Sequence, residues 1–216
     1  MYWSQVFIEV SKGLENTFIV FGSTLLIALP LAALLALVYL SRAKVLKGIL
    51  STFIWIIRGS PLMLQLIFMM FGLPVLLGIP FKNRLLVATL TFIVNYTAYF
   101  IAMFHNGLKV IPQGQWEAAQ MLQLSKYRTL TKVIYPQMIR NTLKPLENET
   151  ITLLKDTALI STLALSDILR NAREVLNRDQ RIESLFIVLI MYLFFSFIII
   201  QFFKYLQRKV RLIWLN

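Results

Sequence analysis

The chain has no cysteine and one histidine, His105, and these absences narrow the chemistry open to it. Without cysteine there is no disulfide framework and no thiolate metal site, and one histidine cannot build a histidine-rich metal site or a histidine relay. The sequence also lacks a Walker lysine motif, a nucleophile elbow and a cluster of metal ligands. We therefore expect no catalysis, no metal and no cofactor within this chain.

Acidic residues are scarce as well, with 10 Asp and Glu against 22 Lys and Arg and a formal net charge of +12. In a soluble protein this excess would suggest nucleic acid as a partner. Here 58% of the residues are hydrophobic and the mean hydropathy is +0.70, more apolar surface than one soluble core of this length can bury. The basic residues flank apolar stretches, as in proteins anchored to the cytoplasmic face of a membrane. We therefore expect membrane lipid as a partner and no nucleic acid.

Five stretches supply the ~20 residues that a helix needs to cross a bilayer. They cover about residues 18–40, 50–77, 85–108, 138–165 and 182–206. The second is broken near its start by Arg58-Gly59-Ser60-Pro61, and the fourth is the most polar. We predict an all-α membrane protein with five transmembrane helices, in a single domain over residues 1–216.

The distribution of Lys and Arg predicts the orientation of these helices. Twelve fall in the connections on one side, from Arg42 to Arg211, and seven fall on the other, from Lys12 to Arg181. Because basic residues are retained in the cytoplasm, we expect the N-terminus outside and the C-terminus in the cytoplasm. The connection between the third and fourth spans then faces the cytoplasm.

That connection, residues 112–136, is long for a loop between packed helices. Pro112 and Gly114 interrupt the chain, Glu117-Ala118-Ala119 belongs to a first short helix, and Ser125 can cap a second helix over residues 126–133. Pattern alone is equally compatible with a hairpin lying on the membrane surface.

Glu117-Ala118-Ala119, followed by Ile134-Tyr135-Pro136, resembles the EAA loop of ABC importer permeases of the polar amino acid (histidine, glutamine and arginine) type. In that family the loop forms coupling helices that dock on a separate ATPase subunit. The resemblance implies that coupling residues are Glu117, Ala118, Ala119, Gln123, Leu124 and Ser125. Gln123 departs from the family pattern, which has glycine at this turn, where a left-handed conformation suits glycine best.

The resemblance extends over about residues 14–210. Further matching segments are Arg58–Leu62, Phe71–Pro74, Asn95–Ala102, Pro136-Gln137, Pro145-Leu146 and Lys155–Leu159. It implies a single permease domain in a prokaryotic inner membrane, with ATP and Mg bound by partner ATPase subunits and an extracytoplasmic solute-binding protein that delivers an amino acid. A second permease copy completes the pathway, either an identical chain or a paralogue.

The fourth span carries charged groups that a lipid-facing helix would not tolerate. Glu149 and Asp156 are seven residues apart and share a helix face, so we predict that they line the substrate pathway, together with Thr157. Asp156 has an alternative role as a structural partner of Lys155 or Arg58.

In the third span, Asn95, Tyr96 and Thr97 are candidates to bind the substrate. They are equally suited to hold helices together. Glu147 stands where the family has glycine, and this extra acid favours a basic amino acid as substrate. Two other functions remain open for the chain. It could be an ion-coupled secondary transporter or a channel that uses the span-four acids, or it could be a membrane-surface scaffold.

Overall fold

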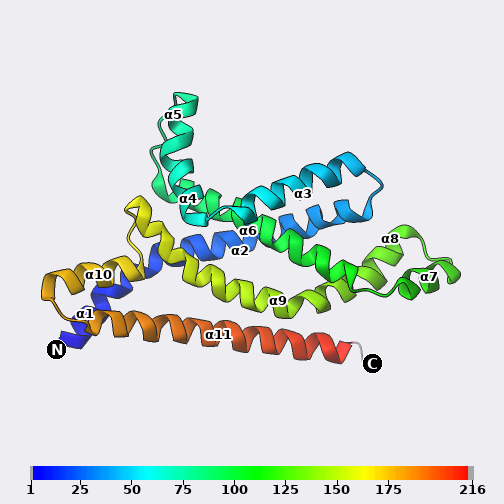
Figure 1. The fold of residues 1–216 in the computed structure, drawn as a ribbon. Helices are drawn as coiled ribbons and strands as arrows, with labels where there is room; N and C mark the ends of the chain where they lie inside the picture. The colour runs from blue at the N-terminus through cyan, green and yellow to red at the C-terminus, as the bar shows by residue number, and fades with distance from the viewer. Residues whose placement is uncertain (1, 214–216) are drawn as a thin grey trace.

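The structure is a computed structural model that describes residues 2–213, and every regular element in this range is helical (Figure 1). In chain order the elements are α1 Tyr2–Ser11, α2 Leu14–Ala36, η1 Leu37–Leu40, α3 Lys44–Gly59, α4 Leu62–Ile67, η2 Phe68–Gly72, α5 Leu73–Leu77, α6 Arg84–Lys109, α7 Gln113–Met121, α8 Lys126–Arg128, η3 Thr129–Ile134, α9 Tyr135–Asp156, η4 Thr157–Leu163, α10 Ile168–Asp179 and α11 Glu183–Ile213. The predicted all-α class is confirmed for this range, and residues 1 and 214–216 of the predicted domain lie outside it.

Three segments of the described chain are long and apolar enough to cross a membrane, Tyr2–Leu40, Arg84–Lys109 and Glu183–Val210. A fourth candidate is the pair Lys44–Gly59 and Leu62–Leu77, whose two parts are bent by 100°. The predicted span 138–165 forms α9 and η4, which are not among these candidates because their polar residues lower the hydropathy. The predicted number of five spans is therefore not confirmed.

The bend between α3 and α4 lies at the break seen in the sequence. Both residues of the break are extended: Ser60 has φ −116° and ψ 142°, and Pro61 has φ −63° and ψ 133°. Proline has no N–H to continue a helix and pushes the preceding residue out of the helical region. The predicted second span is thus a corner, after which α4 packs against α6 and η4 and α5 rises away from the other helices (Figure 1).

Helix α6 lies at the centre of the bundle, between α2 and α9. Ala28, Ala32 and Ala36 of α2 are fully buried, and such small residues let membrane helices approach closely. On the other side, a Cβ atom added to Gly107 would lie 2.5 Å from Thr142 Cγ2, so α6 and α9 also approach closely. The middle of α6 is therefore enclosed by protein, which is where its polar residues stand.

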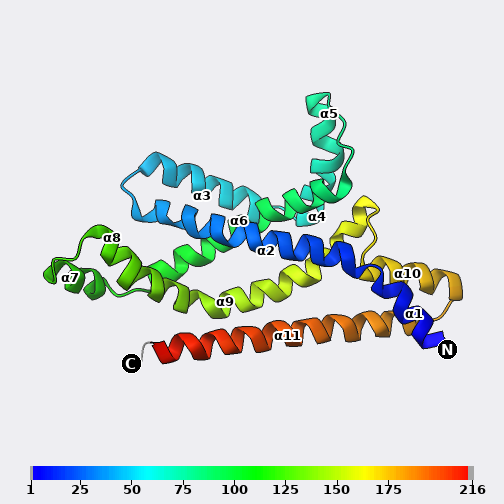
Figure 2. The same ribbon diagram turned by 180° about the vertical axis from the view of Figure 1, so that it is seen from behind.

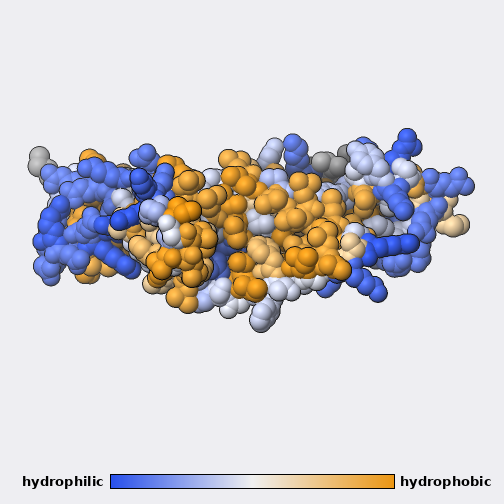
Figure 3. Space-filling view, turned by 90° about the horizontal axis from the view of Figure 1, so that it is seen from above, coloured by the Kyte–Doolittle hydropathy of each residue, from blue (hydrophilic) through white to orange (hydrophobic). Residues whose placement is uncertain are grey.

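The two ends of the molecule carry different elements. The N-terminus, α1 and α10 lie at one end, while α7, α8 and the C-terminal part of α11 lie at the other (Figures 1 and 2). In the view of Figure 3, hydrophobic residues gather in the middle and hydrophilic residues at both ends. A band of this kind matches the apolar interior of a bilayer.

The segment 112–136 contains two short helical pieces, as expected. Ser125 caps the second, its Oγ accepting a hydrogen bond from the Arg128 N–H at 3.3 Å. The predicted end of that helix at residue 133 is wrong, because α8 and η3 run directly into α9. Pro136 therefore lies inside a continuous helical run, two residues after the π-helical turn η3, and its missing N–H removes one backbone hydrogen bond there.

The turn after α7 contains the residue that departs from the family pattern. Gln123 has φ 51°, in the left-handed region. The Leu124 N–H donates to the Ala119 carbonyl at 3.0 Å, the long bond that closes a helix through a left-handed residue. Gln123 therefore takes the conformation that glycine adopts most easily.

Candidate functional site

A cavity of about 490 Å³ opens at the α3–α4 corner, and α6, α9 and the start of η4 form its other walls. Its lining residues are Arg58, Gly59, Ser60, Pro61, Leu62, Met63, Asn95, Tyr96, Tyr99, Glu149, Thr152, Asp156 and Leu159. The corner supplies one wall because the chain turns there, and the enclosed middle of α6 supplies the opposite one.

One basic and two acidic groups line this cavity. The Arg58 guanidinium lies over the Tyr99 ring, 5.0 Å from its centroid, in a cation–π contact. The Tyr96 hydroxyl donates to Asp156 Oδ2 at 2.7 Å. Neither Lys155 nor Arg58 forms an ion pair with Asp156 in the described chain, so Tyr96 holds this carboxylate in place of the partners considered from the sequence.

Glu149 differs from Asp156 in having no fixed partner. Its side chain is half-buried in the cavity wall, and no hydrogen bond or ion pair joins it to the rest of residues 2–213. Arg58 and Asp156 are near enough to interact with it electrostatically. The carboxylate therefore keeps its lone pairs for a ligand that supplies donors.

Four of the six predicted binding residues line the cavity: Asn95, Tyr96, Glu149 and Asp156. Thr97 and Thr157 do not. The Thr97 hydroxyl donates to the Ile93 carbonyl and the Thr157 hydroxyl to the Leu154 carbonyl, both within their own buried turns. Thr97 is two positions from Asn95 and thus lies on another face of α6.

The structure adds polar lining residues that the sequence did not single out for binding. Ser60 is brought in by the corner, Tyr99 stands one turn after Asn95, and Thr152 stands one turn after Glu149. Helical spacing was a usable signal for Tyr99 and Thr152. Arg58 was considered only as a partner of Asp156, and the corner that brings it into the cavity depends on tertiary structure.

Glu147 lies outside this cavity, which corrects its expected place in the site region. It is buried, and it accepts hydrogen bonds from Lys144 Nζ of its own helix at 2.7 Å and from Gln207 Nε2 of α11 at 3.0 Å. Its carboxylate is therefore occupied by protein side chains, and it no longer supports a basic substrate. Within residues 2–213, no group of three or more acidic or histidine side chains has the arrangement of a metal site.

The predicted coupling residues lie together at the end of the molecule that holds α7. Glu117, Ala118, Gln123 and Ser125 are exposed, Leu124 is partly exposed, and Ala119 is buried against the bundle. Met121 and Leu122 are 85% and 73% exposed beside them. Such large exposed apolar side chains at a polar end are a feature of interaction surfaces.

Relatives with similar sequences are transport proteins. The chain is 32% identical over 176 residues to the L-cystine transport system permease protein TcyB of Bacillus subtilis strain 168. The matched region covers 79% of this chain and 73% of that protein. The chain is 30% identical over 173 residues to the arginine ABC transporter permease protein ArtM of Haemophilus influenzae, covering 77% and 76%.

Solved structures have the same fold. A crystal structure of an amino acid ABC transporter with histidines matches with a TM-score of 0.83 and 26% identity, over 96% of this chain and 95% of that one. An inward-facing MetNI methionine ABC transporter matches with a TM-score of 0.69 and 20% identity, over 93% and 94%. Residues 28–212 match the family described as binding-protein-dependent transport system inner membrane component, and the chain therefore belongs to that family.

Proposed function

We propose that this chain is the permease subunit of an ATP-driven importer of amino acids. The observation that carries the proposal is the cavity at the α3–α4 corner, which brings Arg58 together with Glu149 and Asp156. An amino acid has one carboxylate and one ammonium group, and charge-assisted hydrogen bonds to both give orientation and affinity. The names of the relatives, which include cystine, glutamine and arginine systems, agree with this substrate class.

The proposed topology is a single permease domain over residues 1–216 with five crossings in a prokaryotic inner membrane. The polar α9, which packs against α6 and α11, and η4, which packs against α4, α10 and α2, make the fourth crossing. The N-terminus is outside and the C-terminus is cytoplasmic. The position of α7 and α8 at the same end as the C-terminal part of α11 supports this arrangement.

We assign ATP hydrolysis to separate ATPase subunits, which would bind ATP and Mg, with no cofactor in this chain. Their docking surface is α7 with its following turn: Glu117, Ala118, Ala119, Gln123, Leu124 and Ser125. The exposed Met121 and Leu122 supply apolar contact area there. A second permease copy, identical or paralogous, and a solute-binding protein at the α1 and α10 end complete the assembly.

The proposed substrate is a polar amino acid, and a basic one is preferred because the cavity holds two carboxylates and one guanidinium. Glu149 and Asp156 then receive the ammonium group and a cationic side chain, while Arg58 receives the carboxylate. Asn95 and Tyr96 complete the binding wall, and Thr97 and Thr157 support it from within their helices.

The test is co-purification with the ATPase, followed by ATP hydrolysis and uptake in liposomes with and without binding protein and substrate. We expect association with the ATPase and substrate-stimulated hydrolysis, both lost on Glu117→Arg. Binding of L-arginine, L-lysine, L-histidine and L-glutamine, repeated with Glu149→Gln, tests the preference for basic substrates. If no ATPase associates and uptake follows an ion gradient, the chain is an ion-coupled secondary transporter or channel.

A further inference from the structure

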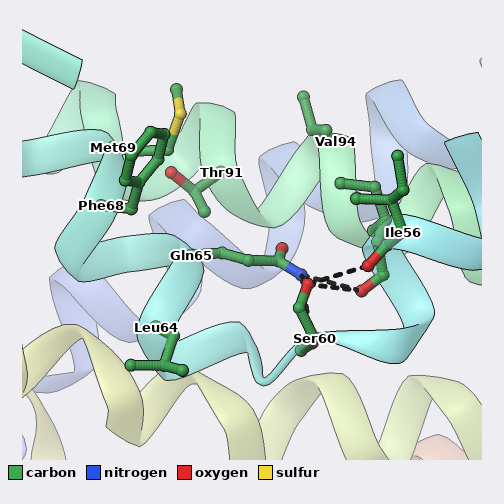
Figure 4. Close-up of a pocket in the computed structure, with 9 residues that line it drawn as sticks. Ile56, Ser60, Leu64, Gln65, Phe68, Met69, Thr91 and Val94 are labelled. Carbon is green, nitrogen blue, oxygen red and sulfur yellow. Dashed lines mark hydrogen bonds between the residues drawn. The ribbon is translucent and has the colours of Figure 1, made fainter. Parts of the chain in front are cut away.

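Gln65, on α4, separates the charged cavity from a second, apolar cavity of about 410 Å³. The lining of the apolar cavity includes Ile56, Gln65, Phe68 and Val94, and Ser60 borders both cavities. Gln65 Nε2 lies 2.8 Å from the Ile57 carbonyl oxygen, 3.2 Å from the Ser60 carbonyl oxygen and 2.8 Å from Ser60 Oγ (Figure 4).

These contacts determine which way the Gln65 amide points. Backbone carbonyl oxygens only accept hydrogen bonds, so the NH2 group of Gln65 has to face Ile57 and Ser60. The carbonyls need this donor because α3 ends at Gly59 and the following Pro61 has no N–H. The corner in the chain therefore orients the side chain, and Gln65 Oε1 is left pointing towards α6.

The orientation passes on to Asn95. Gln65 Oε1 can only accept, and it accepts from Asn95 Nδ2 at 2.9 Å. Asn95 Oδ1 receives no hydrogen bond from residues 2–213, and Asn95 lines the charged cavity. Asn95 thus has its carbonyl oxygen available to a ligand, while one side of its NH2 group is already engaged.

We propose that Gln65 is a positioning residue that sets the polarity of the substrate site, an inference that rests on the proposed amino-acid transport. It holds Asn95 as a hydrogen-bond acceptor in the cavity that Glu149 and Asp156 also line. These three groups are complementary to the ammonium group of an amino acid, and Arg58, which lines the same cavity over the Tyr99 ring, is complementary to its carboxylate. A ligand with a hydroxyl in place of the ammonium group loses the charge and meets an amide that cannot turn to donate.

The test is ligand discrimination by the permease–ATPase complex in nanodiscs, without solute-binding protein, measured by calorimetry. The probes are L-arginine with its 2-hydroxy analogue and L-glutamine with its 2-hydroxy analogue. The quantity compared is the Kd of the hydroxy acid divided by the Kd of the amino acid. For Gln65→Met, we expect this ratio to fall roughly three- to tenfold, because Asn95 is released to turn and its preorganisation is lost.

Two further variants separate positioning from folding. Gln65→Asn keeps an amide near the corner carbonyls but is one methylene too short to reach Asn95, so the ratio should fall in this variant as well. It replaces Gln65→Met as the test if that variant does not fold. Gln65→Glu keeps an acceptor for Asn95 but offers no donor to the Ile57 and Ser60 carbonyls, so the corner no longer orients the side chain and the ratio should fall as it does in Gln65→Met. Thr91→Val, in the wall of the apolar cavity, is a matched control that should leave the ratio unchanged.

An unchanged ratio in Gln65→Met and Gln65→Asn, with wild-type binding intact, would overturn the role of Gln65 and leave amino-acid transport standing. Failure of the wild-type complex to bind either amino acid would instead count against the proposed function.

Discussion

Glu147 and Glu149 are two residues apart on α9, yet they stand in opposite situations. Glu147 faces α11, its side chain is 4% exposed, and its two oxygens accept from Lys144 and Gln207. Glu149 faces the α3–α4 corner and has no partner in residues 2–213. Two positions turn a helix by about 200°, so the two carboxylates leave on different faces.

The difference teaches how a structural acid is told from a ligand-binding one within a single polar helix. A buried carboxylate whose lone pairs are satisfied by other protein side chains contributes to packing and has none left for a ligand. A carboxylate in a cavity wall with free lone pairs is available for binding. Asp156 is intermediate, because Tyr96 occupies one of its oxygens.

The largest expected effect is on ligand binding by Glu149→Gln. The Kd for L-arginine, or for L-glutamine if that is the ligand bound, should rise roughly 10- to 100-fold, since a hydrogen bond to a charged group contributes about 1.5–3 kcal/mol. The measurement is calorimetry on the permease–ATPase complex in nanodiscs. Glu147→Gln is the matched control and should change the Kd less than about twofold. Equal losses in both variants would remove the distinction between the two faces.

Glu147→Ala should act on stability and leave binding unchanged. Gln207, which is partly buried, and the exposed Lys144 would both lose their partner, and the free energy of unfolding should fall by about 1–2 kcal/mol. Reversible unfolding in mixed micelles measures this change, and the same protein is assayed for ligand binding after refolding. A binding defect with unchanged stability would contradict the packing role.

Tyr96→Phe tests the intermediate position of Asp156. Loss of the 2.7 Å hydrogen bond should cost about 1.5 kcal/mol, divided between stability and binding, because Tyr96 is a buried packing residue that also lines the cavity. Unfolding in mixed micelles and calorimetry on the same preparation measure the two parts. Tyr99→Phe keeps the ring beneath Arg58 and is the matched control. An effect on stability alone would place Asp156 with Glu147.

The smallest expected effect is that of Gln207→Ala on α11. Glu147 would keep Lys144, whose side chain is 67% exposed and can follow it, so the free energy of unfolding should fall by only about 0.5–1 kcal/mol. Thermal unfolding in detergent resolves this against Gln201→Ala, an exposed glutamine on the same helix. A loss as large as that of Glu147→Ala would mean that the hydrogen bond from Gln207 of α11, and not the Lys144–Glu147 ion pair within α9, provides most of the stabilisation by Glu147.

Helical spacing in the sequence predicted much of the candidate site. Glu149 and Asp156 were expected on one face, and they line one cavity with Asn95 and Tyr96. Thr97 and Thr157 were expected there too, but each hydroxyl bonds a carbonyl of its own helix. Spacing gives the relative directions of side chains on a helix and does not say which direction faces a cavity. No feature of the sequence pointed to Gln65, because its role depends on backbone carbonyls that lack a backbone donor at the corner.

By itself, the sequence determined the membrane setting, the helical class, the break before Pro61 and the family resemblance, because these follow from composition, local backbone chemistry and short motifs. The tertiary structure decided the 100° bend, the cavity beside it and the different situations of Glu147 and Glu149. The partner Gln207 is 60 residues away from Glu147 in the chain. Which residues meet over such a separation depends on how the helices pack, and packing is a property of the whole bundle.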